Sequence, residues 1–222
     1  MITVHHLNNS RSQRVLWLLE ELGEPYEIVK YQRDRETMLA PPELKKIHPL
    51  GKSPVVVDGD IVLAESGAIL DYFVEKHGRF VPKPGTREWR RYRYWMHYAE
   101  GSAMPPMLLK LVFDRLERAK APFFVKPIVK SISNKAKTGF IAGQLRLHLD
   151  FMEGELAKSA WFAGDEFTVA DIQMSFPLEA AAAAARAGLD GSRPRLMDFL
   201  ARIQARPAYK RALERGGVFK LS

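Results

Sequence analysis

The sequence predicts a small α/β domain followed by an all-helical domain. Within the first part, short apolar strands and amphipathic helices follow the order strand, helix, strand, strand, strand, helix. The segment Pro82-Lys83-Pro84-Gly85 then interrupts every periodic pattern, which is typical of a linker. After Thr86 the spacing of apolar residues is helical throughout. We therefore expect an α/β domain over residues 1–81, a linker over 82–86 and a helical domain over 87–222.

The first strand is expected over residues 2–6, and the polar turn from Asn8 to Ser12 leads into a helix. The apolar residues of this helix recur at i, i+3, i+4 and i+7: Val15, Leu18, Leu19 and Leu22. Gly23 ends the helix, and residues 26–31 have the pattern of a second strand. The adjacent His5 and His6 point to opposite faces of the first strand, so they cannot share a metal ion. We assign no metal site.

A hairpin followed directly by a helix is predicted between Pro49 and Tyr72. Val55 to Val57 are apolar and β-branched, Asp58-Gly59 is typical of a tight hairpin turn, and residues 61–63 form the returning strand. Ser66 has the features of an N-cap, with apolar residues at helical spacing after it: Ile69, Leu70 and Phe73. Strand-helix-strand followed by strand-strand-helix indicates a thioredoxin-like α/β layer.

Two features of this stretch indicate a ligand site. Ser53 precedes Pro54, which has no N–H to donate to the sheet, so the backbone groups of Ser53 are expected to pair with an extended ligand. Glu65 and Ser66 stand where a strand passes into a helix, and a helix N-terminus suits a carboxylate. Because Glu65 can hold an ammonium group, the pair describes a receptor for an α-amino acid head group.

The second half is expected to contain several helices broken by prolines. Residues 87–102 form one helix, and Pro105-Pro106 breaks or kinks its continuation into residues 107–118. A further helix begins before Gly139, and Pro194 begins another. Thr168 and Asp171 have the spacing of a capping box at the start of a buried helix, and removing the Thr168 hydroxyl should cost about 1 kcal/mol.

Composition limits the class of protein. No apolar run approaches the roughly 20 residues of a membrane span, and no signal peptide is expected because Arg11 and Arg14 interrupt the early apolar residues. The chain has no cysteine, which excludes disulfides and fits the cytoplasm. The net charge of +8 comes from bases that are spread along the chain and mixed with acids. This distribution favours general basicity over a nucleic-acid site.

The motifs together resemble the glutathione transferase superfamily over nearly the whole chain, and most closely its serine-type bacterial and fungal members. The resemblance lies in Ser10 before Arg14-Val15, in residues 41–54 with Ser53-Pro54, in Glu65-Ser66 and in the Thr168 box. It implies a cis Pro54 and an antiparallel pairing of Ser53 with the cysteinyl backbone of glutathione. It also implies that Glu65 and Ser66 bind the γ-glutamyl group and that Lys52 meets the glycine carboxylate. Glutathione is then a co-substrate, and no cofactor is expected.

The resemblance implies that a hydroxyl near the start of the first helix stabilises the glutathione thiolate. Ser10 is favoured because it lies four residues before Arg14-Val15, and Ser12 is the alternative. Asn8 or Asn9 could also donate to the sulfur, and both serines could be plain helix caps. A free thiol has a pKa of roughly 8.5, and lowering it by two units requires about 2.7 kcal/mol. A hydroxyl supplies about 1 to 3 kcal/mol of this, and a helix N-terminus adds roughly 0.3 to 1.

We therefore expect a cytoplasmic, homodimeric detoxification enzyme that joins glutathione to a small hydrophobic electrophile. The walls of the electrophile site are expected to include Leu7, Met104, Met107 and Leu108, although these side chains could equally belong to the core. The cations and aromatic residues between Arg87 and Trp95 are assigned to the dimer interface. A non-catalytic binding protein of the same fold is the alternative, and peroxidase activity is a variant.

Overall fold

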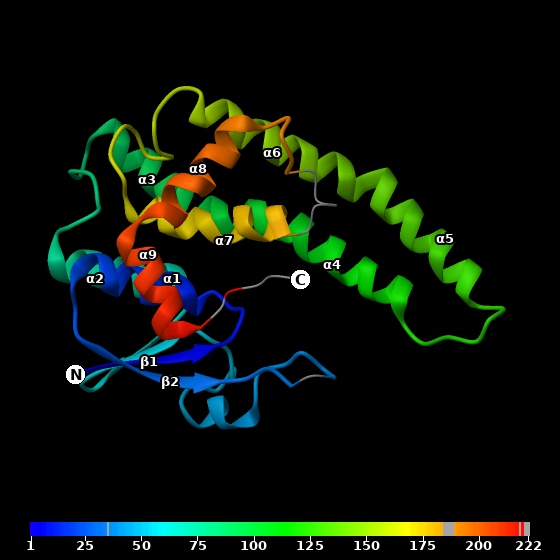
Figure 1. Cartoon of the computed structure of the whole chain (residues 1–222), viewed down its shortest axis with the longest axis horizontal. Coiled ribbons are helices and arrows are strands. Elements are labelled where there is room, and N and C mark those ends of the chain that lie inside the picture. The colour runs from blue at the N-terminus through cyan, green and yellow to red at the C-terminus, as the bar shows by residue number, and fades with distance from the viewer. Residues whose placement is uncertain (35, 184–188, 218, 220–222) are drawn as a thin grey trace.

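The computed structural model describes residues 1–34, 36–183, 189–217 and 219. A four-stranded sheet carries two helices on one face, and a bundle of helices packs on top of them (Figure 1). The strands are β1 (Ile2–Leu7), β2 (Tyr26–Tyr31), β3 (Val55–Asp58) and β4 (Ile61–Ala64), and the two helices are α1 (Ser12–Leu22) and α2 (Ser66–His77). The predicted thioredoxin-like layer followed by a helical part is confirmed.

The strand order β2-β1-β3-β4 determines which segments meet. β2 is parallel to β1, while β3 is antiparallel to β1 and β4 is antiparallel to β3. Leu7 pairs with Tyr31, and Val55 lies opposite both His5 and Ala64. One end of the sheet is therefore where β1, β2 and β4 finish and β3 begins. We call it the site end.

Helix α1 is buried on all sides rather than on one face. Every residue from Ser12 to Leu19 is buried, because α7 (Val169–Ala183) and α9 (Pro207–Gly216) cover the face of α1 that points away from the sheet. One apolar core thus continues from Val56 in the sheet through α1 to Phe199 in the helical part. Gly23 ends α1 with φ +76°, as its position predicts.

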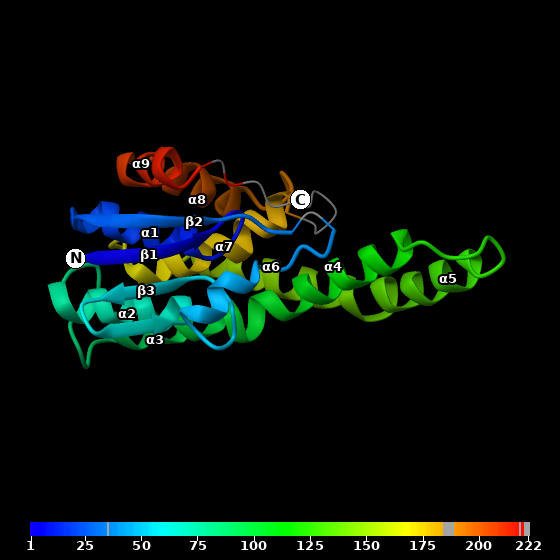
Figure 2. The ribbon, with the colours of Figure 1, turned by 90° about the horizontal axis from the view of Figure 1, so that it is seen from below.

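Two pairs of helices in the second half are joined by single π turns. The turn Ala99–Ala103 joins α3 (Arg87–Tyr98) to α4 (Met104–Arg118), and the turn Lys137–Ile141 joins α5 (Lys126–Ala136) to α6 (Ala142–Leu156). The break falls before Pro105-Pro106, because proline fits the first turn of a helix, where its missing N–H has no intrahelical partner. α4 and α5 project beyond the sheet as a helical hairpin (Figure 2).

The capping box before α7 forms with one change. Asp171 Oδ2 accepts the Thr168 N–H at 2.8 Å, and Oδ1 accepts the Phe162 N–H at 2.9 Å. The Thr168 hydroxyl donates to Asp171 at 3.2 Å instead of accepting a backbone N–H. Burial raises the pKa of Asp171 to about 6 despite these three bonds. The remaining helix, α8 (Pro194–Ala205), begins at the predicted proline. No helix in the described ranges is long and apolar enough to cross a membrane.

Candidate functional site

The predicted ligand residues gather at the site end of the sheet. The Ser53–Pro54 peptide bond is cis, as predicted. The Ser53 hydroxyl donates to the carbonyl oxygen of His5 at 2.9 Å and accepts the N–H of Leu7 at 3.2 Å. These two bonds hold the entrance of β3 against the end of β1. The same end of the sheet carries the turn that follows β1 and the start of α2.

The two candidate serines are hydrogen-bonded to each other at the start of α1. Their Oγ atoms are 2.7 Å apart, and Ser10 Oγ also accepts the N–H of Ser12 at 3.2 Å. Ser12 Oγ lies 2.9 Å from Nδ1 of His6 and 3.3 Å from the carbonyl oxygen of Leu7. Ser12 is completely buried, whereas Ser10 keeps a small exposed fraction of 3%. Ser10 is therefore the outer member of a chain of polar groups that runs inward to His6.

The state of His6 decides which serine has a proton to offer. Burial, reinforced by Lys30, lowers the pKa of His6 to about 4, so its ring is neutral at pH 7 and has a single N–H. Whichever ring nitrogen carries it, the Ser12 hydroxyl has an acceptor inside the protein, either Nδ1 of His6 or the carbonyl oxygen of Leu7. The Ser12 proton is thus used inside the protein. Ser10 then donates the bond between the two serines, and because its hydroxyl is the outer one, it is the one that can turn to an outside acceptor.

A buried arginine lies beneath the start of α2. Nη1 of Arg14 donates to Ser66 Oγ at 3.2 Å and to Glu100 Oε1 at 2.6 Å, and Nε of Arg11 donates to the same Glu100 oxygen at 2.9 Å. Burial lowers the pKa of Arg14 to about 10, so it stays protonated at neutral pH. Burial alone would raise the pKa of Glu100, but the two arginines hold this pKa below its ordinary value. A protonated guanidinium, which shares the Glu100 carboxylate with Arg11, therefore lies beside Ser66.

The N-terminus of α2 has no side-chain cap. Ser66 was predicted to be the N-cap, but it is the first helical residue, and Glu65 before it makes no capping hydrogen bond. The prediction was wrong because Glu65 turns the chain with φ +69°, and the Ser66 hydroxyl instead accepts from Arg14. A non-glycine residue in this region costs about 1–3 kcal/mol. Uncapped N–H groups and the Arg14 charge together make this corner attractive to an anion.

The other predicted site residues differ in accessibility. Lys52 and Glu65 are exposed at the rim of the site end. Of the residues predicted to contact a hydrophobic co-substrate, Leu7 and Met107 are buried, Met104 is half-buried and Leu108 is exposed. Leu108 and part of Met104 are therefore the accessible surface of that set.

Arg14, Glu100 and His6 are the polar residues of the site that sequence reasoning did not assign. The role of Arg14 could have been predicted from the sequence, because a charged residue in the apolar first turns of a helix needs a buried partner. The role of Glu100 could not have been predicted, since it is separated from Arg14 by 86 positions. In the part of the chain that the structure describes, no three or more His, Cys, Asp or Glu side chains come together in a way that could hold a metal ion.

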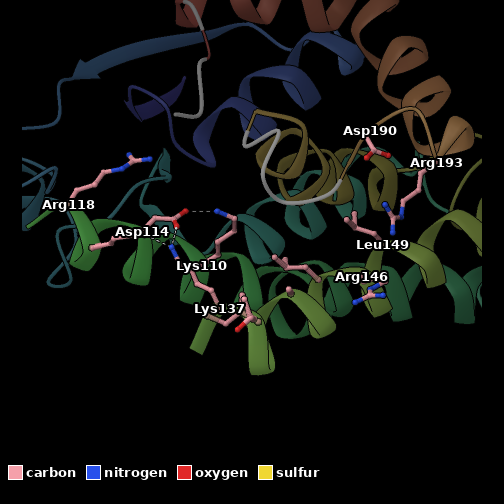
Figure 3. Close-up of a pocket in the computed structure, with 13 residues that line it drawn as sticks. Lys110, Asp114, Arg118, Lys137, Arg146, Leu149, Asp190 and Arg193 are labelled. Atoms are coloured by element: carbon pink, nitrogen blue, oxygen red, sulfur yellow. Dashed lines mark hydrogen bonds and ion pairs between the residues drawn. The ribbon is translucent and has the colours of Figure 1, made fainter. Parts of the chain in front are cut away.

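A separate cavity of about 690 Å³ lies between α4, α6 and the segment before α8 (Figure 3). Its floor is apolar and includes Ile141, Leu145 and Leu149. On the α4 side, Asp114 pairs with both Lys110 and Lys137 at the rim. The cavity shares no lining residue with the predicted site, so it does not contribute to the chemistry argued for that site.

Comparisons with known proteins match both halves of the chain. A family model described as "Glutathione S-transferase, N-terminal domain" matches residues 1–75, and one described as "Glutathione S-transferase, C-terminal domain" matches residues 119–207. Glutathione S-transferase 3 of Schizosaccharomyces pombe is 44% identical over 183 residues, which cover 82% of this chain and 74% of that protein. Glutathione S-transferase 1 of Saccharomyces cerevisiae is 36% identical over 190 residues, covering 82% and 81%.

A solved structure extends the similarity to the whole fold. The crystal structure of a glutathione S-transferase from Actinobacillus pleuropneumoniae superposes with a TM-score of 0.80 at 32% identity. The match covers 100% of this chain and 95% of that one.

Proposed function

Because the chain belongs to the glutathione S-transferase family of enzymes, we propose that it joins glutathione to a small hydrophobic electrophile and that Ser10 stabilises the thiolate. We choose Ser10 over Ser12 because the Ser12 hydroxyl is already hydrogen-bonded to groups inside the protein. The Ser12 proton is directed to His6 or Leu7 inside the protein, whereas the outer Ser10 hydroxyl donates only to Ser12 and can turn from it to a bound sulfur. In the reaction, the sulfur bonds to the electrophilic carbon, the leaving group departs with its bonding electrons, and the thiol proton passes to solvent.

The remaining site residues are proposed to hold glutathione as an extended peptide. The γ-glutamyl carboxylate meets Ser66 and the uncapped N–H groups of α2, where Arg14 adds its charge. Glu65 holds the γ-glutamyl ammonium group, the backbone beside cis Pro54 pairs with the cysteinyl residue, and exposed Lys52 meets the glycine carboxylate. This places the thiol beside the turn that carries Ser10.

Measuring the ultraviolet absorbance of the thiolate of bound glutathione against pH tests the role of Ser10. The Ser10→Ala variant should keep glutathione but raise the thiol pKa by about one to two units, since a hydroxyl bonded to a charged sulfur contributes about 1 to 3 kcal/mol. The matched control is Ser12→Ala, which removes the neighbouring hydroxyl and should shift the thiol pKa less.

Each other result would assign the thiolate to a different residue or change the proposed activity. A larger shift in Ser12→Ala than in Ser10→Ala would move the role to Ser12. An unchanged pKa in both variants would move it to Asn8 or Asn9. Glutathione that binds to the unmodified protein with an unshifted thiol would favour the non-catalytic alternative. Turnover of organic hydroperoxides but not of electrophiles would favour the peroxidase variant.

We also propose that the enzyme is a cytoplasmic homodimer that pairs through α3 and α6. Tyr94 in α3 is 49% exposed, and Leu147 and Phe151 in α6 are 61% and 38% exposed. The ring centroids of Tyr94 and Phe151 are 6.4 Å apart, so the apolar surface is continuous between the two helices. A patch of this kind favours a protein contact. Sedimentation of the protein and of a Leu147→Glu variant tests it, and a monomeric unmodified protein would refute it.

A further inference from the structure

Arg33 contacts the Ser10 turn from the side away from the proposed glutathione residues, and the charges of Arg11 and Arg115 lie near enough to act on it. Arg33 follows β2, and in the strand order β2-β1-β3-β4 it lies across β1 from Ser53 and Ser66. Arg11 stands between the two sides at the start of α1, and Arg115 belongs to α4. A thiolate beside Ser10 would therefore have glutathione on one side and these cations on the other, where the second substrate must enter.

Arg33 is held rigidly against the Ser10 turn. Its Nε donates to the carbonyl oxygen of Asn8 at 3.2 Å, and its Nη2 donates to that of Asn9 at 3.3 Å. Nη1 donates to the carbonyl oxygen of Met38 at 3.0 Å. The cation is thus fixed by neutral carbonyl groups. No bound carboxylate neutralises it, because the salt bridges of the described residues include neither Arg33 nor Arg115.

The three positive charges are close enough to repel one another. The pKa of Arg33 is lowered first by burial and then by the charges of Arg11 and Arg115. Arg11 does have an acidic partner, Glu100, but that carboxylate is shared with Arg14. Asp34, next to Arg33 in the chain, instead accepts hydrogen bonds from Thr37 in its own loop. The entrance therefore carries an excess of positive charge that a bound anion would relieve.

The same side of α4 also offers apolar surface. Leu108, Leu111 and Arg115 are spaced at i, i+3 and i+7, so they lie along one face of the helix. Leu108 is 57% exposed and Leu111 is 38% exposed. The segment that follows β2 extends toward α4 in both views of the molecule (Figures 1 and 2). An apolar strip thus leads to the cationic end of the entrance.

From this arrangement we propose that the preferred electrophile is an amphipathic anion, whose apolar reactive body lies on Leu108 and Leu111 while its carboxylate or similar acid group meets Arg115 and Arg33. The inference rests on the proposed function and names the substrate class of that same site. An acid group gains charge-assisted bonds that a neutral molecule of equal shape lacks. The recognition is independent of the reacting atoms.

A chlorodinitrobenzoic acid and its methyl ester are the matched probes. In both, the glutathione sulfur bonds to the ring carbon, the carbon–chlorine bond breaks, chloride leaves with the electron pair, and the thiol proton goes to solvent. Each enzymatic kcat/KM is divided by the uncatalysed rate constant with glutathione, which removes the difference in ring reactivity. At low salt we expect the corrected kcat/KM of the acid to be about tenfold higher than that of the ester. This acid-to-ester ratio should fall as salt is added.

The variant Arg115→Met isolates the charge. It should lower the acid-to-ester ratio by about fivefold to tenfold, and Arg115→Glu should reverse the preference. The control is Arg146→Met, which removes an equal charge from α6 at the separate cavity (Figure 3) and should leave the ratio within about twofold.

Two results separate the possible failures. If both probes react but the ester is preferred, or Arg115→Met and Arg146→Met change the ratio equally, the inference is wrong and the proposed function stands. If neither probe reacts and bound glutathione has an unshifted thiol pKa, the proposed function fails, and the substrate class fails with it.

Discussion

Replacing Glu179 by glutamine should remove a pH-dependent weakness of the fold. Glu179 is buried in α7, where its carboxylate accepts the Tyr209 hydroxyl and a side-chain bond from Gln204, with Arg14 nearby. Burial raises its pKa from an ordinary 4.5 to about 7, and the Tyr209 bond and Arg14 only partly oppose this. The folded protein therefore binds this proton more tightly than the unfolded chain does.

The sign and size of the effect follow from linkage. Because the folded-state pKa is raised, the stabilisation from this proton is complete below pH 4.5 and is lost as the pH rises through about 7. The difference of about 2.5 units, at 1.36 kcal/mol per unit, amounts to about 3 kcal/mol of unfolding free energy. Above pH 8 the unmodified protein carries this whole penalty.

The assay is urea unfolding of the unmodified protein and of Glu179→Gln at pH 5 and pH 8.5. Glutamine keeps the acceptor for Tyr209 and cannot ionise, so between pH 5 and pH 8.5 the unfolding free energy of the variant should rise by about 2.5 kcal/mol relative to that of the unmodified protein. Subtracting the unfolding free energy of one protein from that of the other at each pH cancels the contributions of the titrating groups that both proteins share. Parallel pH profiles for the two proteins would refute the assignment of a raised pKa to Glu179.

Two further predictions concern packing and capping. Asp171→Ala should lower the unfolding free energy by about 2 to 4 kcal/mol, because the two buried N–H groups that donate to Asp171 lose their acceptor. Thr168→Val removes only the hydroxyl and should cost about 1 kcal/mol. Equal losses of stability in thermal unfolding of the two variants would contradict this geometry. Gly216→Ala should cost about 1 to 3 kcal/mol, since the added carbon would lie 2.6 Å from Cδ1 of the buried Leu16. The control Gly154→Ala, in the helix interior of α6 with no atom within 4 Å, should instead gain up to about 1 kcal/mol.

Patterns that depend on neighbouring residues were predictable from the sequence. The Asp58-Gly59 turn, the end of α1 at Gly23 and the start of α8 at Pro194 each follow from backbone preferences of one or two residues. The cis bond before Pro54 was inferred from the resemblance, since local chemistry favours the trans form. Local preference also explains the error at Ser66, because a serine before a helix resembles a cap until a long-range partner such as Arg14 takes its hydroxyl.

The sequence by itself determined the order of strands and helices, the ligand motifs at Ser53-Pro54 and Glu65-Ser66, and the family to which they point. Only the tertiary structure decided what those motifs face. Ser10 and Ser12 carry the same side chain, and they differ because Ser12 meets His6, whose ring packs beside Gly216 more than 200 positions away. The charges of Arg33 and Arg115 act on each other only because the fold brings the segment after β2 near α4. Charge and hydrogen bonding act through space over a few ångströms, and the fold sets those distances.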